Sequence, residues 1–265
     1  MRCKFPLLAV DVGNSRIKLG VYRQPPVEAF PDPDESLTLP VGWSPAELDA
    51  LLPGNLRDYA CLVASVNRAA AAELSEQLRT RGAAEVRLLE AGDLPLAIRL
   101  EQPERVGMDR LVGAVAAARL RDPARAAILI DLGTAITVDL VAADGAFEGG
   151  AILPGIGLSA RALHQFTDLL PLVPMVDLGD PPPALGRNTD AAVRSGLYWG
   201  SVGGVRELAR RMSEGRDAQI FLTGGAAPLV ARLLEDSRGE PARFVPHLTL
   251  AGIVLAACLG PTGEG

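Results

Sequence analysis

The sequence has few of the side chains that build metal, redox or disulfide sites. Its 265 residues include three cysteines and two histidines, and aromatic residues make up only 4%. Cys3, Cys61 and Cys258 are far apart, which excludes a zinc-ligand spacing or a disulfide framework. Each lies in or beside an apolar stretch, so we interpret all three as small core residues. His164 and His247 have no acidic or cysteine partner at a useful spacing, which argues against a histidine-based triad or metal centre.

Long hydrophobic runs and an excess of positive charge are also missing. The most apolar segment, 248–259, is too short to span a bilayer. Residues 1–10 do not have the pattern of a signal peptide. The formal net charge of −6 argues against nucleic-acid binding, which normally uses a basic surface. We therefore expect a cytoplasmic globular protein that binds neither nucleic acid nor a membrane.

One short pattern is present twice. The sequence Asp-Val-Gly-Asn-Ser at 11–15 follows an apolar run, and Asp-Leu-Gly-Thr-Ala at 131–135 follows another. In both copies the next residues alternate between apolar and polar, which is typical of a β-hairpin with a tight turn. The copies lie 120 positions apart, and this spacing predicts a duplicated fold with a cleft between its halves.

The rest of the chain alternates between predicted helices and strands, which favours an α/β fold with mixed sheets. In the first half we expect a surface connection with at most an edge strand over 25–40, helices over 44–52, 68–81 and 107–120, and strands over 61–66, 86–89 and 96–100. Ala72, Leu74 and Leu78 are expected on or near one face of the second helix. The break at 121–123 predicts two domains, 1–121 and 122–265.

In the second half we expect strands over 127–131, 134–141, 146–152 and 218–222, and near 244. Helices are expected over 155–166, 189–212, 228–234 and 248–258, with a proline-rich loop over 170–183.

Both predicted turns have groups that suit a nucleoside triphosphate and its metal. Each turn offers backbone N–H groups and a polar side chain to a phosphate, and Asp11 and Asp131 offer carboxylates to a cation. Lys18, on the strand that leaves the first turn, is placed to reach a β- or γ-phosphate. The alternatives are ordinary turn chemistry and a solvated strand lysine.

Two glycine-rich segments point to the same chemistry. Thr-Gly-Gly at 223–225 follows a predicted strand and precedes a helix, where the backbone can approach a flat ligand or a phosphate closely. The alternative is a plain strand-to-helix turn. Four glycines within 149–155 suggest a backbone that passes close to a ligand or to the other domain.

Asp109, at the start of a predicted helix, has the chemistry of a general base for phosphoryl transfer to an alcohol. A helix cap is the alternative. Arg110 is either a clamp for a substrate anion or an exposed helix arginine. Thr189, before the longest helix, is either an N-cap or a substrate contact.

Six segments in order along nearly the whole chain resemble the motifs of the type III pantothenate kinase family, which also contains proteins named Bvg accessory factors. The segments are 11–18, Pro103 with 107–110, 131–137, 149–155, 188–189 with 195–196, and 223–225. The resemblance implies a duplicated ribonuclease-H-like, actin-like ATPase fold with ATP between the halves. It also implies phosphorylation of pantothenate with ATP and Mg²⁺, the first step of coenzyme A synthesis, by a homodimer.

The resemblance also implies roles for individual residues. Asp109 would be the base, Asp131 would bind a monovalent cation (K⁺ or NH₄⁺), and Thr134 would contact ATP. The pantothenate site would contain Leu100, Gly107, Met108, Asp109, Arg110 and Thr189. The ATP phosphates would be held by Asp11, Val12, Gly13, Asn14, Ser15, Arg16, Ile17 and Lys18.

One position departs from the family pattern. The family usually has a tyrosine seven positions before the first glycine of the Gly-x-Asp-Arg motif, and Leu100 stands there in this chain. Leucine keeps an apolar contact but removes a hydroxyl and an aromatic face. Two alternatives to pantothenate kinase therefore remain: a kinase of another small hydroxyl compound, and a non-catalytic nucleotide-binding accessory factor.

Overall fold

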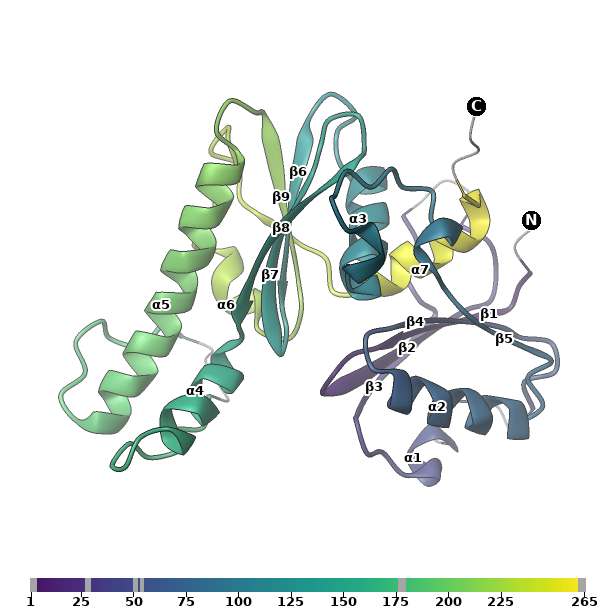
Figure 1. The fold of residues 1–265 in the computed structure, drawn as a ribbon, viewed down its shortest axis with the longest axis horizontal. Helices are drawn as coiled ribbons and strands as arrows, with labels where there is room; N and C mark the ends of the chain where they lie inside the picture. The colour runs from purple at the N-terminus through teal and green to yellow at the C-terminus, as the bar shows by residue number, and fades with distance from the viewer. Residues whose placement is uncertain (1–3, 27–29, 50–51, 53–54, 176–179, 262–265) are drawn as a thin grey trace. The chain divides into compact units, whose positions relative to one another are not determined.

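The computed structural model describes residues 4–26, 30–49, 52, 55–175 and 180–261. The chain forms two compact units (Figure 1). Unit 1 contains residues 1–120, 145–147 and 247–265, and unit 2 contains residues 121–144 and 148–246. The domain boundary at 121/122 stays a prediction. The last helix of the chain packs within unit 1, which the sequence did not indicate. In the described part of the chain, no helix has the length and apolar character to cross a membrane.

Unit 1 is built on a five-stranded sheet of order β3-β2-β1-β4-β5. The first three strands pair antiparallel, and β4 and β5 continue the sheet in parallel with β1. Each residue of β1 is buried, which explains why its sequence is apolar up to Asp11. The strands are β1 (Leu7–Val12), β2 (Arg16–Tyr22), β3 (Glu35–Pro40), β4 (Ala60–Ser65) and β5 (Glu85–Leu88).

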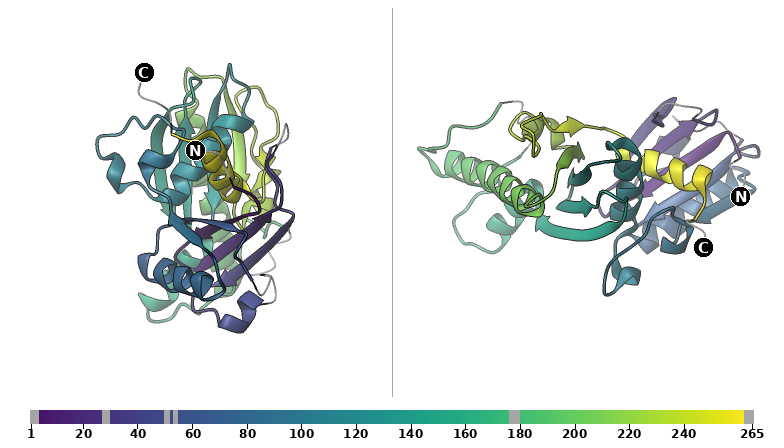
Figure 2. Two further views of the ribbon diagram at one scale, coloured as in Figure 1. Left: turned by 90° about the vertical axis from the view of Figure 1, so that its right-hand side faces the viewer. Right: turned by 90° about the horizontal axis from the view of Figure 1, so that it is seen from above.

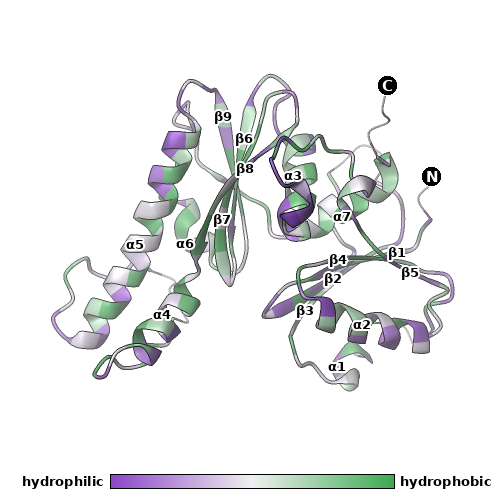
Figure 3. Ribbon diagram, in the orientation of Figure 1, coloured by the Kyte–Doolittle hydropathy of each residue, from purple (hydrophilic) through white to green (hydrophobic). Residues whose placement is uncertain are grey.

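Helices cover both faces of this sheet. Leu74 and Leu78 of α2 pack with Val10 and Leu19 in the core on one face. On the other face lie α3 and α7, and Figure 2 shows α7 running across the strands. Figure 3 shows hydrophilic and hydrophobic residues mixed along α2, as expected for a helix on a surface. The helices of unit 1 are α1 (Pro45–Asp49), α2 (Arg68–Thr80), α3 (Met108–Leu120) and α7 (Leu248–Leu259).

Helices α3 and α7 cross at very short range. A Cβ at Gly252 of α7 would lie 1.8 Å from the carbonyl oxygen of Val112 on α3, so only glycine fits at this crossing. Residues 248–256 of α7 are all buried. The apolar C-terminal segment is therefore the central core helix of unit 1.

Unit 2 repeats the plan of unit 1. Its sheet has the order β10-β9-β6-β7-β8, in which β6 pairs antiparallel with β7 and parallel with β9. Read from β8, this is the strand order of unit 1. The strands are β6 (Ala126–Leu132), β7 (Ala135–Val141), β8 (Phe147–Pro154), β9 (Ala218–Thr223) and β10 (Arg243–Phe244).

The long helix α5 covers one face of the second sheet. Tyr198, Val202 and Val205 of α5 pack with Ile130 and Val138 in the core of unit 2. The helices of unit 2 are α4 (Ile156–Gln165), α5 (Thr189–Met212) and α6 (Ala227–Ala231). The repeated strand order confirms the predicted duplicated α/β fold.

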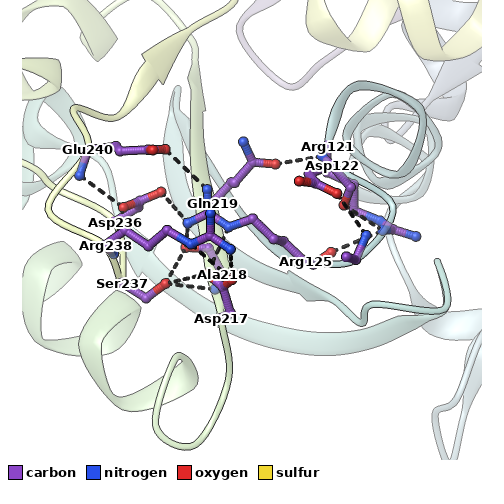
Figure 4. A network of polar contacts seen from close by, with 11 residues as sticks. Arg121, Asp122, Arg125, Asp217, Ala218, Gln219, Asp236, Ser237, Arg238 and Glu240 are labelled. Carbon is purple, nitrogen blue, oxygen red and sulfur yellow. Dashed lines mark hydrogen bonds and ion pairs between the residues drawn. The ribbon is translucent and has the colours of Figure 1, made fainter.

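A buried arginine connects the strands of unit 2 to the loop before β10 (Figure 4). Arg125 is only 2% exposed and donates hydrogen bonds to Asp217 (2.8 Å), Asp236 (2.6 Å) and Glu240 (3.1 Å). The side chain of Asp236 is as buried as that of Arg125, so the two charges compensate each other inside the protein. Arg238, which is exposed, binds the other oxygen of Asp217.

Most predicted elements are present within two residues of their expected ends, and five expectations are wrong. Residues 96–100 form no strand, because only Ile98 bridges to Phe147 before the chain turns away. Ala72 is exposed, since the buried face of α2 runs through Ala71, Leu74 and Leu78.

Helix α6 ends at Ala231 rather than 234. Of the cysteines, Cys61 is buried as expected, Cys258 is half-buried rather than a core residue, and Cys3 lies outside the described residues. Helix α1 ends at Asp49, and Leu52, which is described, is not helical.

Candidate active site

The first predicted phosphate turn joins β1 to β2. Val12 pairs with Ile17, and the Gly13 N–H donates a hydrogen bond of 3.0 Å to the Arg16 carbonyl, which closes the turn. Asn14, Ser15 and Arg16 are exposed. The turn therefore presents backbone and side-chain donors to solvent, as a phosphate site requires.

Asp11 is buried beneath this turn and has two partners in unit 1. It pairs across the strands with Lys18, whose Nζ lies 3.6 Å from Asp11 Oδ2. The Thr249 hydroxyl of α7 donates a hydrogen bond of 3.0 Å to the same oxygen. The carboxylate is thus fixed from two sides. Lys18 remains close to the turn, with 25% of its side chain exposed.

Asp109 lies in the first turn of α3. The Gly107 carbonyl accepts the first helical hydrogen bonds, from Arg110 and Leu111, so Gly107 rather than Asp109 occupies the N-cap position. Asp109 Oδ1 accepts a hydrogen bond of 2.8 Å from the Arg110 N–H, so it also satisfies one helix-end donor. A Cβ at Gly107 would lie 2.5 Å from this same oxygen, and glycine leaves the carboxylate room.

The structure brings Asp109 to the edge of the sheet that carries the first turn. A Cβ at Gly107 would lie 3.2 Å from the side chain of Val66, the residue that follows β4. The Val66 N–H in turn donates a hydrogen bond of 3.0 Å to the carbonyl of Val12, the last residue of β1. Asp109 and the 11–18 turn therefore lie at the same sheet edge within unit 1.

The neighbouring predicted substrate residues belong to unit 1 as well. Met108 and Arg110 are half-buried, and the Arg110 guanidinium carbon lies 5.5 Å from the centre of the Phe147 ring. Leu100, also half-buried, follows the short segment in which Ala97 and Arg99 bond to the Phe147 backbone. Phe147 thus connects the Leu100 segment to Arg110, a role that its sequence context did not indicate.

The second predicted turn joins β6 to β7 in unit 2. Leu132 pairs with Ile136, and Gly133 and Thr134 are exposed at the tip. The Gly155 N–H donates to the Thr134 carbonyl (3.0 Å), and a Cβ at Gly155 would lie 2.4 Å from that oxygen. The glycine-rich segment before α4 therefore packs directly against a turn of its own unit, and its predicted approach to a ligand or to the other domain stays a prediction.

Asp131 is surrounded by glycine backbone. It is half-buried, and its Oδ1 atom is fully buried. A Cβ at Gly224 would lie 2.4 Å from this Oδ1, and Gly224 has a φ of +94° that other residues rarely adopt. A Cβ at Gly133 would lie 3.4 Å from the same oxygen. The loop after β9 thus packs against the second turn, while the predicted approach of a ligand to residues 223–225 stays a prediction.

These surroundings fit a hard cation. A carboxylate beside exposed backbone is an oxygen donor set of the type that such ions prefer. Within the described ranges, no group of three or more His, Cys, Asp or Glu side chains is arranged to hold a metal ion. Any metal here must therefore take most of its ligands from phosphate, backbone and water.

Thr189 is exposed and begins α5. Asn188 is the N-cap, since its side chain accepts a hydrogen bond of 2.8 Å from the Ala191 N–H, so the N-cap interpretation of Thr189 is wrong. Thr189 belongs to unit 2, and its place beside residues 100–110 stays a prediction.

Comparison with known proteins gives a consistent result. A family model described as "Type III pantothenate kinase" matches residues 7–211. A type III pantothenate kinase of Paramagnetospirillum magneticum is 39% identical over 85% of this chain and 88% of its own length. One from Desulfosudis oleivorans is 32% identical over 93% of this chain and 96% of its own.

A solved structure has the same fold. A putative 2-dehydro-3-deoxygalactonokinase of Sinorhizobium meliloti has a TM-score of 0.55 at 16% identity, covering 95% of this chain and 97% of that one.

Proposed function

The chain belongs to the type III pantothenate kinase family, and from that premise we propose how its residues divide the work of the reaction. The enzyme phosphorylates pantothenate with ATP, which is the first step of coenzyme A biosynthesis. The observation that best supports a mechanism is the position of Asp109 at the sheet edge of the exposed 11–18 turn.

Each of the two turns offers groups that suit the phosphates of ATP. In unit 1, the exposed donors of residues 14–16 and the Lys18 ammonium receive phosphate oxygens, while Asp11 holds Lys18 in place. In unit 2, Thr134 offers its hydroxyl and backbone from the tip of the second turn. The Mg²⁺ that accompanies ATP supplies further neutralisation of phosphate charge.

Asp109 is the general base. Its carboxylate accepts the proton of the primary hydroxyl of pantothenate as that oxygen bonds to the γ-phosphorus. The bond from phosphorus to the bridging oxygen breaks, and ADP leaves. The hydrogen bond from the Arg110 N–H orients the carboxylate for this transfer.

Pantothenate occupies the surface around the start of α3. Gly107 and Met108 provide backbone beside the base, and Arg110 provides a positive charge for the substrate carboxylate. Leu100 supplies an apolar contact in place of the usual tyrosine. The resemblance to the family motif supports Thr189 as a further substrate contact. The half-buried state of Leu100 and Arg110 suits contact with a small ligand.

Asp131 holds a monovalent cation, K⁺ or NH₄⁺, close to the second turn. The buried Oδ1 and the glycines around it support this role. Backbone carbonyls and phosphate oxygens would supply the further oxygen ligands that such an ion needs.

We place the enzyme in the cytoplasm as a homodimer. Support for the dimer comes from large apolar side chains that unit 2 exposes along α4 and the following loop. Phe166 is 80% exposed and Leu169 is 87% exposed, and Leu158, Leu172 and Leu185 are exposed as well. Exposed apolar groups at this density are typical of an interface.

The decisive experiment measures ATP consumption with and without pantothenate in the presence of Mg²⁺ and K⁺. Asp109→Asn should lower kcat by about 10²- to 10⁴-fold, because it removes the base, while ATP affinity stays unchanged. Glu104→Gln is the matched control, since Glu104 is an exposed carboxylate five positions earlier. Normal turnover by the Asp109→Asn enzyme would refute the assignment of the base.

A further inference from the structure

The duplicated hairpins allow a residue-by-residue comparison of their carboxylates. In unit 1 the closing pair is Val12 with Ile17, and the next pair outward is Asp11 with Lys18. In unit 2 the closing pair is Leu132 with Ile136, and the next pair outward is Asp131 with Thr137. Thr137 therefore stands at the position that Lys18 occupies in unit 1.

Both pairs lie on equivalent faces of their sheets. Ile17 and Val12 point into the core beneath α2, so Asp11 and Lys18 lie on the opposite face. Leu132 and Ile136 point into the core beneath α5, so Asp131 and Thr137 also lie on the opposite face. Directly paired residues of antiparallel strands have Cβ atoms about 5 Å apart, so residue 137 is the cross-strand neighbour of Asp131.

Unit 1 shows what a lysine does at this position. The Lys18 ammonium reaches to 3.6 Å from the Asp11 carboxylate, so the positive charge beside this aspartate is covalently attached to the hairpin. At the matching position, unit 2 has a hydroxyl that carries no charge. The two halves of the duplication thus differ by one positive charge at one defined place.

We propose that residue 137 determines whether the cation beside Asp131 is exchangeable or covalently attached. The inference rests on the cation role of Asp131 given under the proposed function. Threonine at 137 leaves the charge to be supplied by a free monovalent ion, which takes the place that the Lys18 ammonium has in unit 1. A lysine at 137 supplies that charge from the strand itself, and the enzyme no longer needs the ion.

The experiment compares Thr137→Lys with Thr137→Met, because methionine has a similar length and no charge. Two quantities are measured with potassium chloride and with tetramethylammonium chloride at equal ionic strength. One is the turnover of pantothenate, and the other is the rise in melting temperature that ATP produces. Thallium(I) binding, followed by ²⁰⁵Tl NMR, reports occupancy of the ion site without any turnover.

The wild-type enzyme and Thr137→Met should need potassium, with activation of about tenfold or more. Thr137→Lys should show about twofold activation or less, an ATP-induced rise in melting temperature that potassium does not alter, and loss of the thallium signal. A folded Thr137→Lys protein with the potassium dependence of wild type would overturn the proposal.

Should Thr137→Lys not fold, the reverse substitution decides. Lys18→Met removes the attached charge in unit 1, so ATP should bind more weakly and ammonium chloride should restore the affinity. An affinity loss that ammonium does not restore would then overturn the proposal.

The wild-type measurements separate this inference from its premise. A wild-type enzyme that phosphorylates pantothenate without needing potassium overturns the cation role of Asp131, and the inference with it. A potassium-dependent wild type beside an equally dependent Thr137→Lys overturns the inference alone.

Discussion

The Thr249 hydroxyl donates a hydrogen bond of 3.0 Å to Asp11, 238 positions earlier in the chain. Both groups are buried, so this contact ties the C-terminal helix to the strand that carries the first phosphate turn. Helix α7 is therefore part of the machinery that positions the Asp11 carboxylate, in addition to filling the core of unit 1.

Replacing Thr249 by valine should destabilise the protein and weaken ATP binding. Valine keeps the shape of threonine but removes a hydrogen bond to a buried carboxylate, which is worth about 2 kcal/mol. Urea unfolding and ATP titration measure the two effects. Thr249→Ser is the matched control because it keeps the hydroxyl; equal losses in both variants would assign the effect to packing instead.

Alanine substitutions at two helical glycines should have opposite effects on stability, because one glycine lies at the crossing of α3 and α7 and the other lies on the surface of α5. Gly252→Ala should cost about 3 kcal/mol or more, because the new Cβ meets the Val112 carbonyl oxygen at 1.8 Å. Gly200→Ala on the exposed side of α5 meets nothing within 4 Å and should stabilise by about 0.5–1 kcal/mol. Thermal unfolding of both variants tests the contrast, and a well-tolerated Gly252→Ala would contradict the observed crossing.

Removing the buried Arg125 should cost more stability than removing the exposed Arg238. Arg125→Met should destabilise by about 3–5 kcal/mol, because it leaves the buried Asp236 carboxylate without its partner. Arg238→Met removes an exposed arginine from the same network and should cost about 1 kcal/mol or less. Urea unfolding of both variants measures the two losses of stability. Similar losses would contradict the view that burial makes the Arg125 interactions more important than those of Arg238.

Cys61 should resist alkylation in the folded protein. Burial, with a smaller effect of Glu85, raises the pKa of its thiol from 9.0 to about 12. Because this pKa is raised, the stabilising effect of the protonated thiol is complete below pH 9 and is lost as the pH rises towards 12. Iodoacetamide labelling at pH 9, read by peptide mass spectrometry, should modify the half-buried Cys258 and spare Cys61 until urea is added. Rapid native labelling of Cys61 would contradict its burial.

The sequence was sufficient to predict the features that depend on neighbours along the chain. The alternation around Asp11 and Asp131 identified both hairpins, because strand faces and turn chemistry are local. The start of the 44–52 helix was also predictable, because a serine followed three residues later by glutamate is a capping pattern, and the structure shows the Ser44 N–H and hydroxyl bonded to Glu47. The six motifs in order identified the family.

Features that depend on distant partners were not predictable from one sequence. The Leu96–Leu100 run alternates like a strand, yet a strand needs a neighbour, and among the residues that the structure describes only Phe147 bridges to it. Thr249 lies in a helix whose apolar sequence suggested only core packing. The partners of Arg125 lie 92 to 115 positions away, so nothing near it in the chain indicated that it is buried.

The place of α7 in unit 1 also constrains how the protein is made. Translation produces residues 148–246 before residues 247–259, so a ribosome completes unit 2 while unit 1 still lacks its central helix. Until that helix emerges, only α3, among the helices that the structure describes, covers this face of the sheet of unit 1. A nascent chain stalled before Leu248 therefore exposes the apolar surface of α3 and of the sheet that this helix covers in the complete protein.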